Sequence, residues 1–423
     1  MFDYLIEQHN LQSGARLINI KTNMPISIIS AWFRAGSCFD PVGKEGLAHF
    51  FEHLLMSRTK RYPTQTELTL AISREGINRN ATTYADCACY YYKQSVDKTL
   101  LALDFLLDGL NSTPVLEDDI AAEYVIIADE RIRKYNNPMR YLSSLSQIGL
   151  WPGKSLGRPL LGTEQTLQSI TLDDFLKFKE NYYQPCNAVF VAVSNEDPKK
   201  IIEKIERGYI ATGKTFTKKR SEYLQKPSVV TLDQRTMNQV AVAINFRTAP
   251  LRDEAMPILD LVASYYFTNS WISQLVRKMR LERDFSYWVN GGSNGYFDTG
   301  FVNINYSTEP QKLCKSIEIV FEEINKLKNG DIRTADLDGA KALARLAYLT
   351  NTMNPYDIMM WYGRQGVLCD KVCSINDYLA AMLAVTPTDI QRVARKYLIK
   401  ENLAIALIGP VKEEDILKSI TIA

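Results

Sequence analysis

Short β-prone segments alternate with longer helical segments along the first half of the chain. The β-prone segments are rich in β-branched and aromatic residues, and turn residues such as Asn23 and Pro25 separate them. They predict strands over residues 16–21, 26–33, 77–84, 87–94 and 188–193. Apolar residues at helical spacing predict helices over residues 46–56, 65–74, 97–111, 117–134 and 172–181. This alternation predicts an α+β domain.

The second half of the chain repeats this order, which indicates an internal duplication. Residues 239–247 echo the strand that ends at Phe33, at an offset of about 213 residues, and Thr386 echoes the helix start at Thr171. We therefore predict two homologous α/β-sandwich domains in tandem. Their predicted limits are residues 1–212 and 230–423, joined by a basic linker over residues 213–229.

The amino-acid composition is that of an ordinary globular protein. Of the 423 residues, 46% are hydrophobic and 23% are charged, and the formal net charge is only +2. The sequence has no basic stripe, so we expect no nucleic-acid partner. No apolar run reaches the roughly 18 residues of a membrane span, and the first residues lack a signal-peptide pattern. Seven cysteines at irregular spacings are typical of reduced thiols, so we expect a cytoplasmic protein with no membrane partner.

Candidate chemistry is concentrated in the helix predicted over residues 46–56. It is apolar almost all round, and its central polar residues are His49, Glu52 and His53. Positions i, i+3 and i+4 lie on one face of a helix, so these side chains project to one place. Two imidazoles at this spacing can bind zinc, and the carboxylate can act on water there. The alternative is a chance pair of core histidines, although the chain has only one other histidine, His9.

A third metal ligand would decide between these readings, and the helix predicted over residues 117–134 offers one. Glu123 and Glu130 flank its apolar centre and lie on one helical face. Carboxylates beside a buried segment need compensating charge or hydrogen bonds. A metal held by two histidines would supply the compensating charge to Glu130. The alternative is that Glu130 is an ordinary exposed carboxylate on the helix surface.

With these motifs the chain resembles the inverted-zincin metallopeptidases, the family of pitrilysin, insulin-degrading enzyme and mitochondrial processing peptidase, over nearly its whole length. The resemblance implies one Zn²⁺ per chain, held by His49, His53 and Glu130, with Glu123 supporting a ligand and Glu52 as the catalytic base. It also implies that an edge strand containing Asn80, Ala81 and Thr82 binds the peptide substrate.

A second motif of the same family lies in the second half of the chain. Arg280 and Tyr287, seven residues apart, resemble the family's arginine–tyrosine pair. The resemblance implies that both residues contact the substrate and act in catalysis. The chain departs from the family pattern at Asp284 and Arg58, where glycine is usual.

We therefore expect a zinc endopeptidase or oligopeptidase that hydrolyses unfolded peptides inside a closed chamber. The resemblance implies that two-domain chains pair into a four-domain clamshell, and we expect a homodimer. One alternative is the catalytic subunit of a heterodimer that processes precursor peptides. The other is a non-catalytic core or assembly subunit, against which the complete set of site residues argues.

Overall fold

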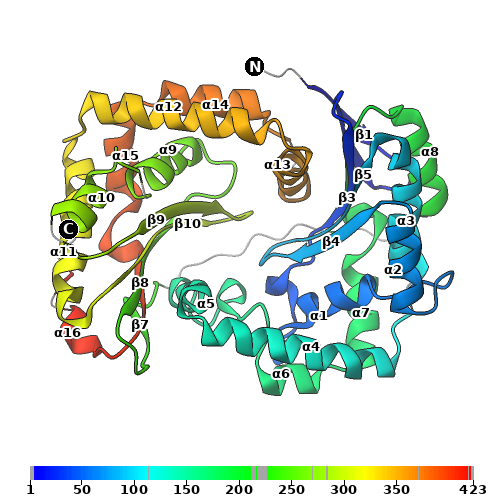
Figure 1. The fold of residues 1–423 in the computed structure, drawn as a ribbon, viewed down its shortest axis with the longest axis horizontal. Helices are drawn as coiled ribbons and strands as arrows, with labels where there is room; N and C mark the ends of the chain where they lie inside the picture. The colour runs from blue at the N-terminus through cyan, green and yellow to red at the C-terminus, as the bar shows by residue number, and fades with distance from the viewer. Residues whose placement is uncertain are drawn as a thin grey trace. The chain divides into compact units, whose positions relative to one another are not determined.

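Two mixed β-sheets form the centres of two structural units (Figure 1). The structure is a computed structural model, and it describes residues 4–112, 114–210, 216, 226–268, 270–282, 284–369, 371–417 and 419–420. Most of the predicted linker, residues 213–229, lies outside the described residues. Within these ranges, no helix combines the length and the apolarity that crossing a bilayer requires.

The first sheet has six strands in the order β1-β2-β6-β3-β5-β4, and only the β2–β6 pair is parallel. The strands are β1 (Leu5–Asn10), β2 (Arg16–Lys21), β3 (Ile26–Phe33), β4 (Asn78–Thr83), β5 (Ala88–Ser95) and β6 (Ala188–Ser194). The helices beside this sheet are α1 (Leu47–Leu55), α2 (Gln65–Arg74), α3 (Thr99–Ser112), α4 (Glu117–Asn136), α6 (Glu164–Ser169), α7 (Leu172–Tyr182), α8 (Pro198–Gly208) and α13 (Pro355–Leu368).

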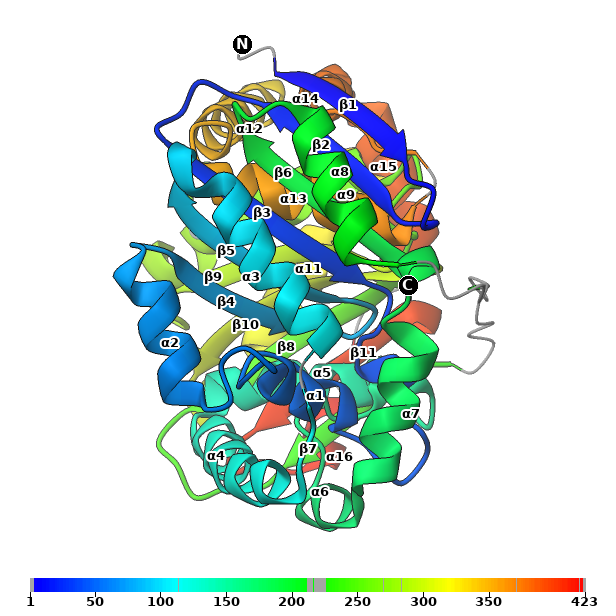
Figure 2. The same ribbon diagram turned by 90° about the vertical axis from the view of Figure 1, so that its right-hand side faces the viewer.

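Strand β3 is buried on both faces, because successive side chains of a strand point to opposite sides of the sheet. Ile29, Ala31 and Phe33 belong to the apolar core under the helices of the first half of the chain, and α3 and α8 cover this face in Figure 2. Trp32 points the other way and is covered by α13, whose Gly363 lies against the indole ring. The first unit is therefore layered on both sides of its sheet.

The second sheet has five strands in the order β7-β11-β8-β10-β9, with only the β7–β11 pair parallel. Its strands are β7 (Val230–Asp233), β8 (Val240–Thr248), β9 (Val289–Gly295), β10 (Gly300–Thr308) and β11 (Leu403–Ile408). Apart from the extra strand β1, this order matches the order β2-β6-β3-β5-β4 of the first sheet. The prediction of two α+β domains of one kind is therefore confirmed.

The second sheet is covered on both faces in the same way as the first. Val242 and Ile244 of β8 face the larger apolar core, whereas Ala241 and Ala243 face Leu142 of helix α5. The α-helices and π-helical segments described in this unit are α5 (Pro138–Leu150), α9 (Met256–Leu261), η5 (Val262–Tyr266), α10 (Gln274–Val276), η6 (Arg277–Glu282), α11 (Leu313–Asn329), α12 (Thr334–Asn351), α14 (Ile375–Ala384), α15 (Pro387–Tyr397) and α16 (Glu413–Leu417). Both η5 and η6 are π-helical.

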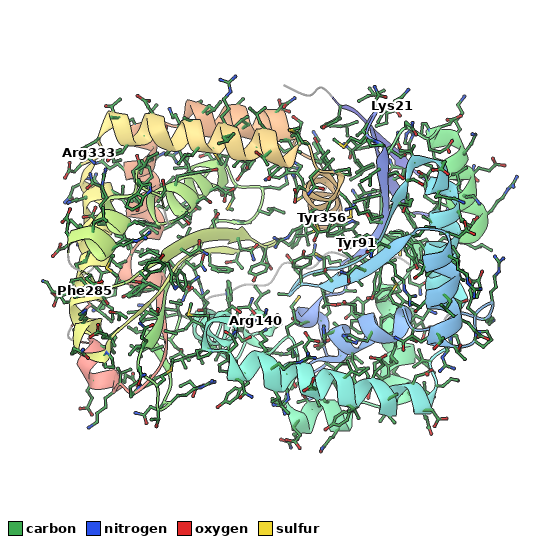
Figure 3. All side chains as sticks on the ribbon, viewed as in Figure 1. Lys21, Tyr91, Arg140, Phe285, Arg333 and Tyr356 are labelled. Atoms are coloured by element: carbon green, nitrogen blue, oxygen red, sulfur yellow. The ribbon has the colours of Figure 1, made fainter. Side chains whose placement is uncertain are left out.

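The two units exchange one helix each, while the predicted division of the chain at residues 213–229 lies mostly outside the described residues and stays a prediction. Helix α5 comes from the first half of the chain but packs on the second sheet, and α13 comes from the second half but packs on the first. Tyr356 of α13 meets Tyr91 of β5 with ring centroids 5.3 Å apart, as Figure 3 shows. The physical reason is that a sheet with apolar side chains on both faces must be covered on both.

Candidate metal centre

Helix α1 begins at a tightly built turn that fixes the direction of its polar face. Gly46 has a φ of 99°, in the left-handed region, and a Cβ there would lie 3.0 Å from the backbone nitrogen of Gly162. The buried Asp40 carboxylate accepts hydrogen bonds from the backbone N–H groups of Gly46 and Ala48, each at 2.8 Å. The first turn of α1 is thus anchored just before His49.

Three potential metal ligands converge from α1 and α4. One ligand atom from each of His49, His53 and Glu130 lies within 4.8 Å of the others. The Oε2 atom of Glu130 is 3.7 Å from Nε2 of His49 and 3.9 Å from Nε2 of His53. Two imidazole nitrogens and one carboxylate oxygen form the donor set of a catalytic zinc site, which leaves a fourth position for water or substrate. The residues present therefore fit Zn²⁺.

Glu123, also on α4, orients one of these histidines. Its Oε2 atom lies 3.0 Å from Nδ1 of His53. A proton on Nδ1 would be donated to Glu123, and the lone pair of Nε2 would then face Glu130 and the metal position. Burial alone would lower the pKa of His53, but the hydrogen bond to Glu123 and the charges of Glu52, Glu123 and Glu130 raise it overall. These carboxylates make the position strongly attractive to a cation.

Glu52 lies beside the ligands and is held by the sheet. Thr83 at the end of β4 donates a hydrogen bond to Oε2 of Glu52. Burial raises the pKa of Glu52, while the Thr83 hydrogen bond and the nearby His53 oppose that rise. Glu52 and His53 line one pocket together with Asn80 and Ala81 of β4.

Strand β4 is the last strand of the first sheet. In the described part of the chain it pairs only with β5, so its outer edge has no strand beside it. Asn80, Ala81 and Thr82 lie in its centre. An unpaired edge that borders the Glu52 pocket can accept an extended peptide as an additional strand.

The described residues of the second unit contain no equivalent metal group. The positions about 213 residues after His49 and His53 are Val262 and Tyr266 in η5. Among the described residues, no second group of three potential ligands is found. The two domains share a fold, but within the described part of the chain only the first has such a group of potential ligands.

Arg280 and Tyr287 lie together in the second unit. The Cζ atom of Arg280 is 4.5 Å from the centroid of the Tyr287 ring. Between them, Asp284 adopts a φ of 48° and is the only described non-glycine residue with positive φ. This conformation explains why glycine would be favoured at the position. The other departure, Arg58, donates a hydrogen bond to Asp119 of α4.

Comparison with known proteins gives the family. Residues 17–164 match the family described as Insulinase (Peptidase family M16), and residues 169–343 match the Peptidase M16 inactive domain. An uncharacterized zinc protease of Bacillus subtilis, YmxG, is 25% identical over 96% of this chain and 98% of its own length. The beta subunit of the mitochondrial-processing peptidase of Bos taurus is 21% identical over 95% of this chain and 84% of its own length. A protease structure from Helicobacter pylori covers 97% of this chain and 100% of its own, with a TM-score of 0.87 and 21% identity.

The fold and the His49, His53 and Glu130 group thus define a zinc metalloprotease of the inverted-zincin type. The chain belongs to peptidase family M16, with an N-terminal catalytic-type domain and a C-terminal domain of the inactive type.

Sequence reasoning missed three residues that shape these sites. Asp40 and Thr83 act through hydrogen bonds to α1 and to Glu52, and neither has a sequence spacing that would reveal the contact. The third is Trp271, whose ring centroid lies 5.3 Å from the Cζ atom of Arg280. Tryptophan nine residues before an arginine is no recognisable pattern.

Proposed function

We propose that this chain is a zinc-dependent endopeptidase or oligopeptidase that hydrolyses unfolded peptides. The observation that carries the proposal is the convergence of His49, His53 and Glu130, with the half-buried carboxylate of Glu52 beside them. Bound zinc would polarise the scissile carbonyl and lower the pKa of water. The remaining steps would fall to side chains of the protein.

Glu52 would serve as the general base. It would accept the proton of the attacking water and pass it to the leaving amine. Its raised pKa makes it a stronger base than an exposed carboxylate. The hydroxyl of Thr83, which donates to Oε2 of Glu52, would hold the carboxylate in place and leave Oε1 for the water.

Substrate recognition would use the backbone of the peptide. The free edge of β4 supports the addition of an extended segment, whose main-chain groups would pair with those of Asn80, Ala81 and Thr82. Strand pairing requires an extended chain, so a folded domain could not bind in this way. We therefore propose unfolded peptides as the substrate class.

Arg280 and Tyr287 would complete the site from a second copy of the chain. Tyr287 would donate a hydrogen bond to the developing oxyanion, and Arg280 would bind the substrate. In the four-domain relatives that this chain resembles, the metal and the arginine–tyrosine pair come from different domains across a chamber. Two copies of a two-domain chain would reproduce that arrangement as a closed clamshell. One relative is named as a subunit, so a heterodimer with a related chain is the alternative partnership.

Replacing the proposed base tests the function. Glu52→Gln removes the proton acceptor but none of the three proposed ligands, so zinc content should be unchanged while peptide hydrolysis falls by about 10²- to 10⁴-fold. Glu117→Gln, which changes an exposed residue in the first turn of α4, is the matched control and should be as active as the wild type. Normal hydrolysis by Glu52→Gln would show that the base is assigned wrongly.

A further inference from the structure

An exposed aromatic cluster surrounds Arg280 in the second unit. Trp271 is 61% exposed and Tyr287 is 77% exposed. The Cζ atom of Arg280 lies 5.3 Å from the ring centroid of Trp271 and 4.5 Å from that of Tyr287. Large apolar side chains that gather on a surface mark an interaction site more often than scattered ones do.

Arg280 has cation–π contacts where its neighbour has an ion pair. Arg277, three residues earlier in the same helical segment, lies 3.4 Å from the carboxylate of Asp336. No carboxylate of the described residues lies within ion-pair distance of Arg280, and none accepts a hydrogen bond from it. A guanidinium that stacks on aromatic rings through its face keeps its N–H groups at the edge. Those donors are available to an oxygen of a bound molecule.

The backbone between Arg280 and Tyr287 has two unusual features. Residues 277–282 form the π-helical segment η6, and Asp284 follows with a φ of 48°. The N–H groups of Phe285 and Ser286 both donate to the carbonyl oxygen of Met279, at 2.7 and 3.1 Å. Phe285, which makes the first of these hydrogen bonds, is labelled in Figure 3. Such strained, π-helical segments are concentrated at functional sites.

We propose that Trp271 is a positioning residue for Arg280, holding its guanidinium so that the N–H edge meets an oxygen of the bound peptide. This inference rests on the proposed function, in which Arg280 binds the peptide substrate. Trp271 supplies one aromatic wall and Tyr287 supplies the other. Without Trp271 the guanidinium would lose one of its two aromatic contacts and sample more rotamers, so each hydrogen bond to the peptide would cost more side-chain entropy.

The test measures peptide binding separately from hydrolysis. The full chain carrying Glu52→Gln is titrated against an unstructured fluorescent peptide, and Kd is read from anisotropy. Trp271→Ala should weaken binding by about two- to fivefold, the range of an exposed cation–π contact. Trp271→Phe should restore most of the affinity. Leu346→Ala removes an apolar side chain of the same unit that is also 61% exposed, and it should leave Kd unchanged.

A double-mutant cycle shows whether Trp271 acts through Arg280. If it does, Trp271→Ala should cause no further loss in a chain that already carries Arg280→Ala. An equal loss in both backgrounds would mean that Trp271 contacts the peptide independently, and no loss in either would mean that it has no role. Both results would overturn the inference, as would failure of the chain to bind peptides.

The same experiment separates this inference from the proposed function. Suppose that Trp271→Ala weakens peptide binding only when Arg280 is present, but the wild type does not hydrolyse the peptide. This result would support the role of Trp271 and reject the peptidase function. Normal zinc-dependent hydrolysis, together with an effect of Trp271→Ala that does not depend on Arg280, would support the peptidase function and reject the role of Trp271. Thermal unfolding of Trp271→Ala should match the wild type, because the side chain is mostly exposed.

Discussion

At the scale of single residues, Asp40 anchors the first turn of α1, the helix that carries His49 and His53. Its carboxyl group is buried and accepts hydrogen bonds from two backbone N–H groups at the beginning of α1. Burial raises the pKa of Asp40 to about 8, although those two N–H groups and Arg158 act in the opposite direction. The folded protein therefore keeps a proton on this group at pH values where the unfolded chain has released it.

This pKa predicts how stability depends on pH. Between about pH 4 and pH 8 the folded state binds more protons at Asp40 than the unfolded state, so its contribution to the free energy of unfolding is complete below pH 4 and is lost as the pH rises towards 8. The slope from one proton is at most about 1.4 kcal/mol per pH unit. Asp40→Asn should remove this part of the slope.

The measurement is denaturant unfolding of wild type and Asp40→Asn from pH 4 to pH 8, with a chelator present so that metal release does not contribute. Other buried groups titrate in both proteins, so the difference between the two curves isolates Asp40. Parallel curves would mean that Asp40 does not titrate in this range.

The candidate ligand residues on each helix could be recognised in the sequence because helical spacing is a local property. His49, Glu52 and His53 share a face wherever their helix lies, and Glu123 and Glu130 do the same on α4. The contact of Thr83 with Glu52 depends instead on how β4 packs against α1, which no local pattern encodes.

At the scale of elements, the helix that each unit receives from the other half of the chain covers one face of a sheet. Helix α13 fits closely over the first sheet because it has glycine where the indole of Trp32 lies. A Cβ on Gly363 would come within 2.1 Å of that ring, and Trp32 is completely buried. The close approach leaves no space for a methyl group.

Gly363→Ala should therefore destabilise the protein by about 1–3 kcal/mol, the usual cost of overpacking a core. Gly109→Ala in α3 is the matched control. Its added Cβ would meet its nearest neighbour, the carbonyl oxygen of Leu55, at an ordinary 3.7 Å. Alanine favours helices over glycine by up to about 1 kcal/mol, so the control should be neutral or stabilising. Denaturant unfolding measures both, and equal stability of the two variants would contradict the packing of α13 on β3.

The duplication of the sheets could be predicted from sequence, whereas the exchange of helices could not. The echoes of β3 in β8 and of Thr171 in Thr386 fall at a nearly constant offset, and the sheets do share a strand order. Helices α5 and α13 are ordinary helical segments in sequence, and nothing in their composition states which sheet they cover. The sheet that each helix covers is determined by how well their side chains pack together, as Leu142 does against Ala241 and Ala243.

At the scale of the whole molecule, the proposed composite site requires two chains. Glu52→Gln chains and Arg280→Ala/Tyr287→Phe chains should each be nearly inactive alone. A mixed dimer has one intact site, built from the Glu52 of one chain and the arginine–tyrosine pair of the other. Equal mixing with free exchange should restore about a quarter of wild-type activity, since half the dimers are mixed and each has one of two sites intact.

The control for this experiment is proof of exchange, obtained by pulling down one tagged chain with the other. Exchange without recovered activity would reject the composite site, and a fully active monomer would reject it as well. Recovery only after the addition of a different, related chain would favour the heterodimer.

The central claim, a zinc centre held by His49, His53 and Glu130, is tested most directly by elemental analysis of the purified chain. The wild type should hold about one zinc, and His49→Ala, His53→Ala and Glu130→Gln should each lose it. His9→Ala changes the only other histidine and should keep the full metal content. Zinc retained by all three ligand variants, or lost equally by His9→Ala, would contradict the account.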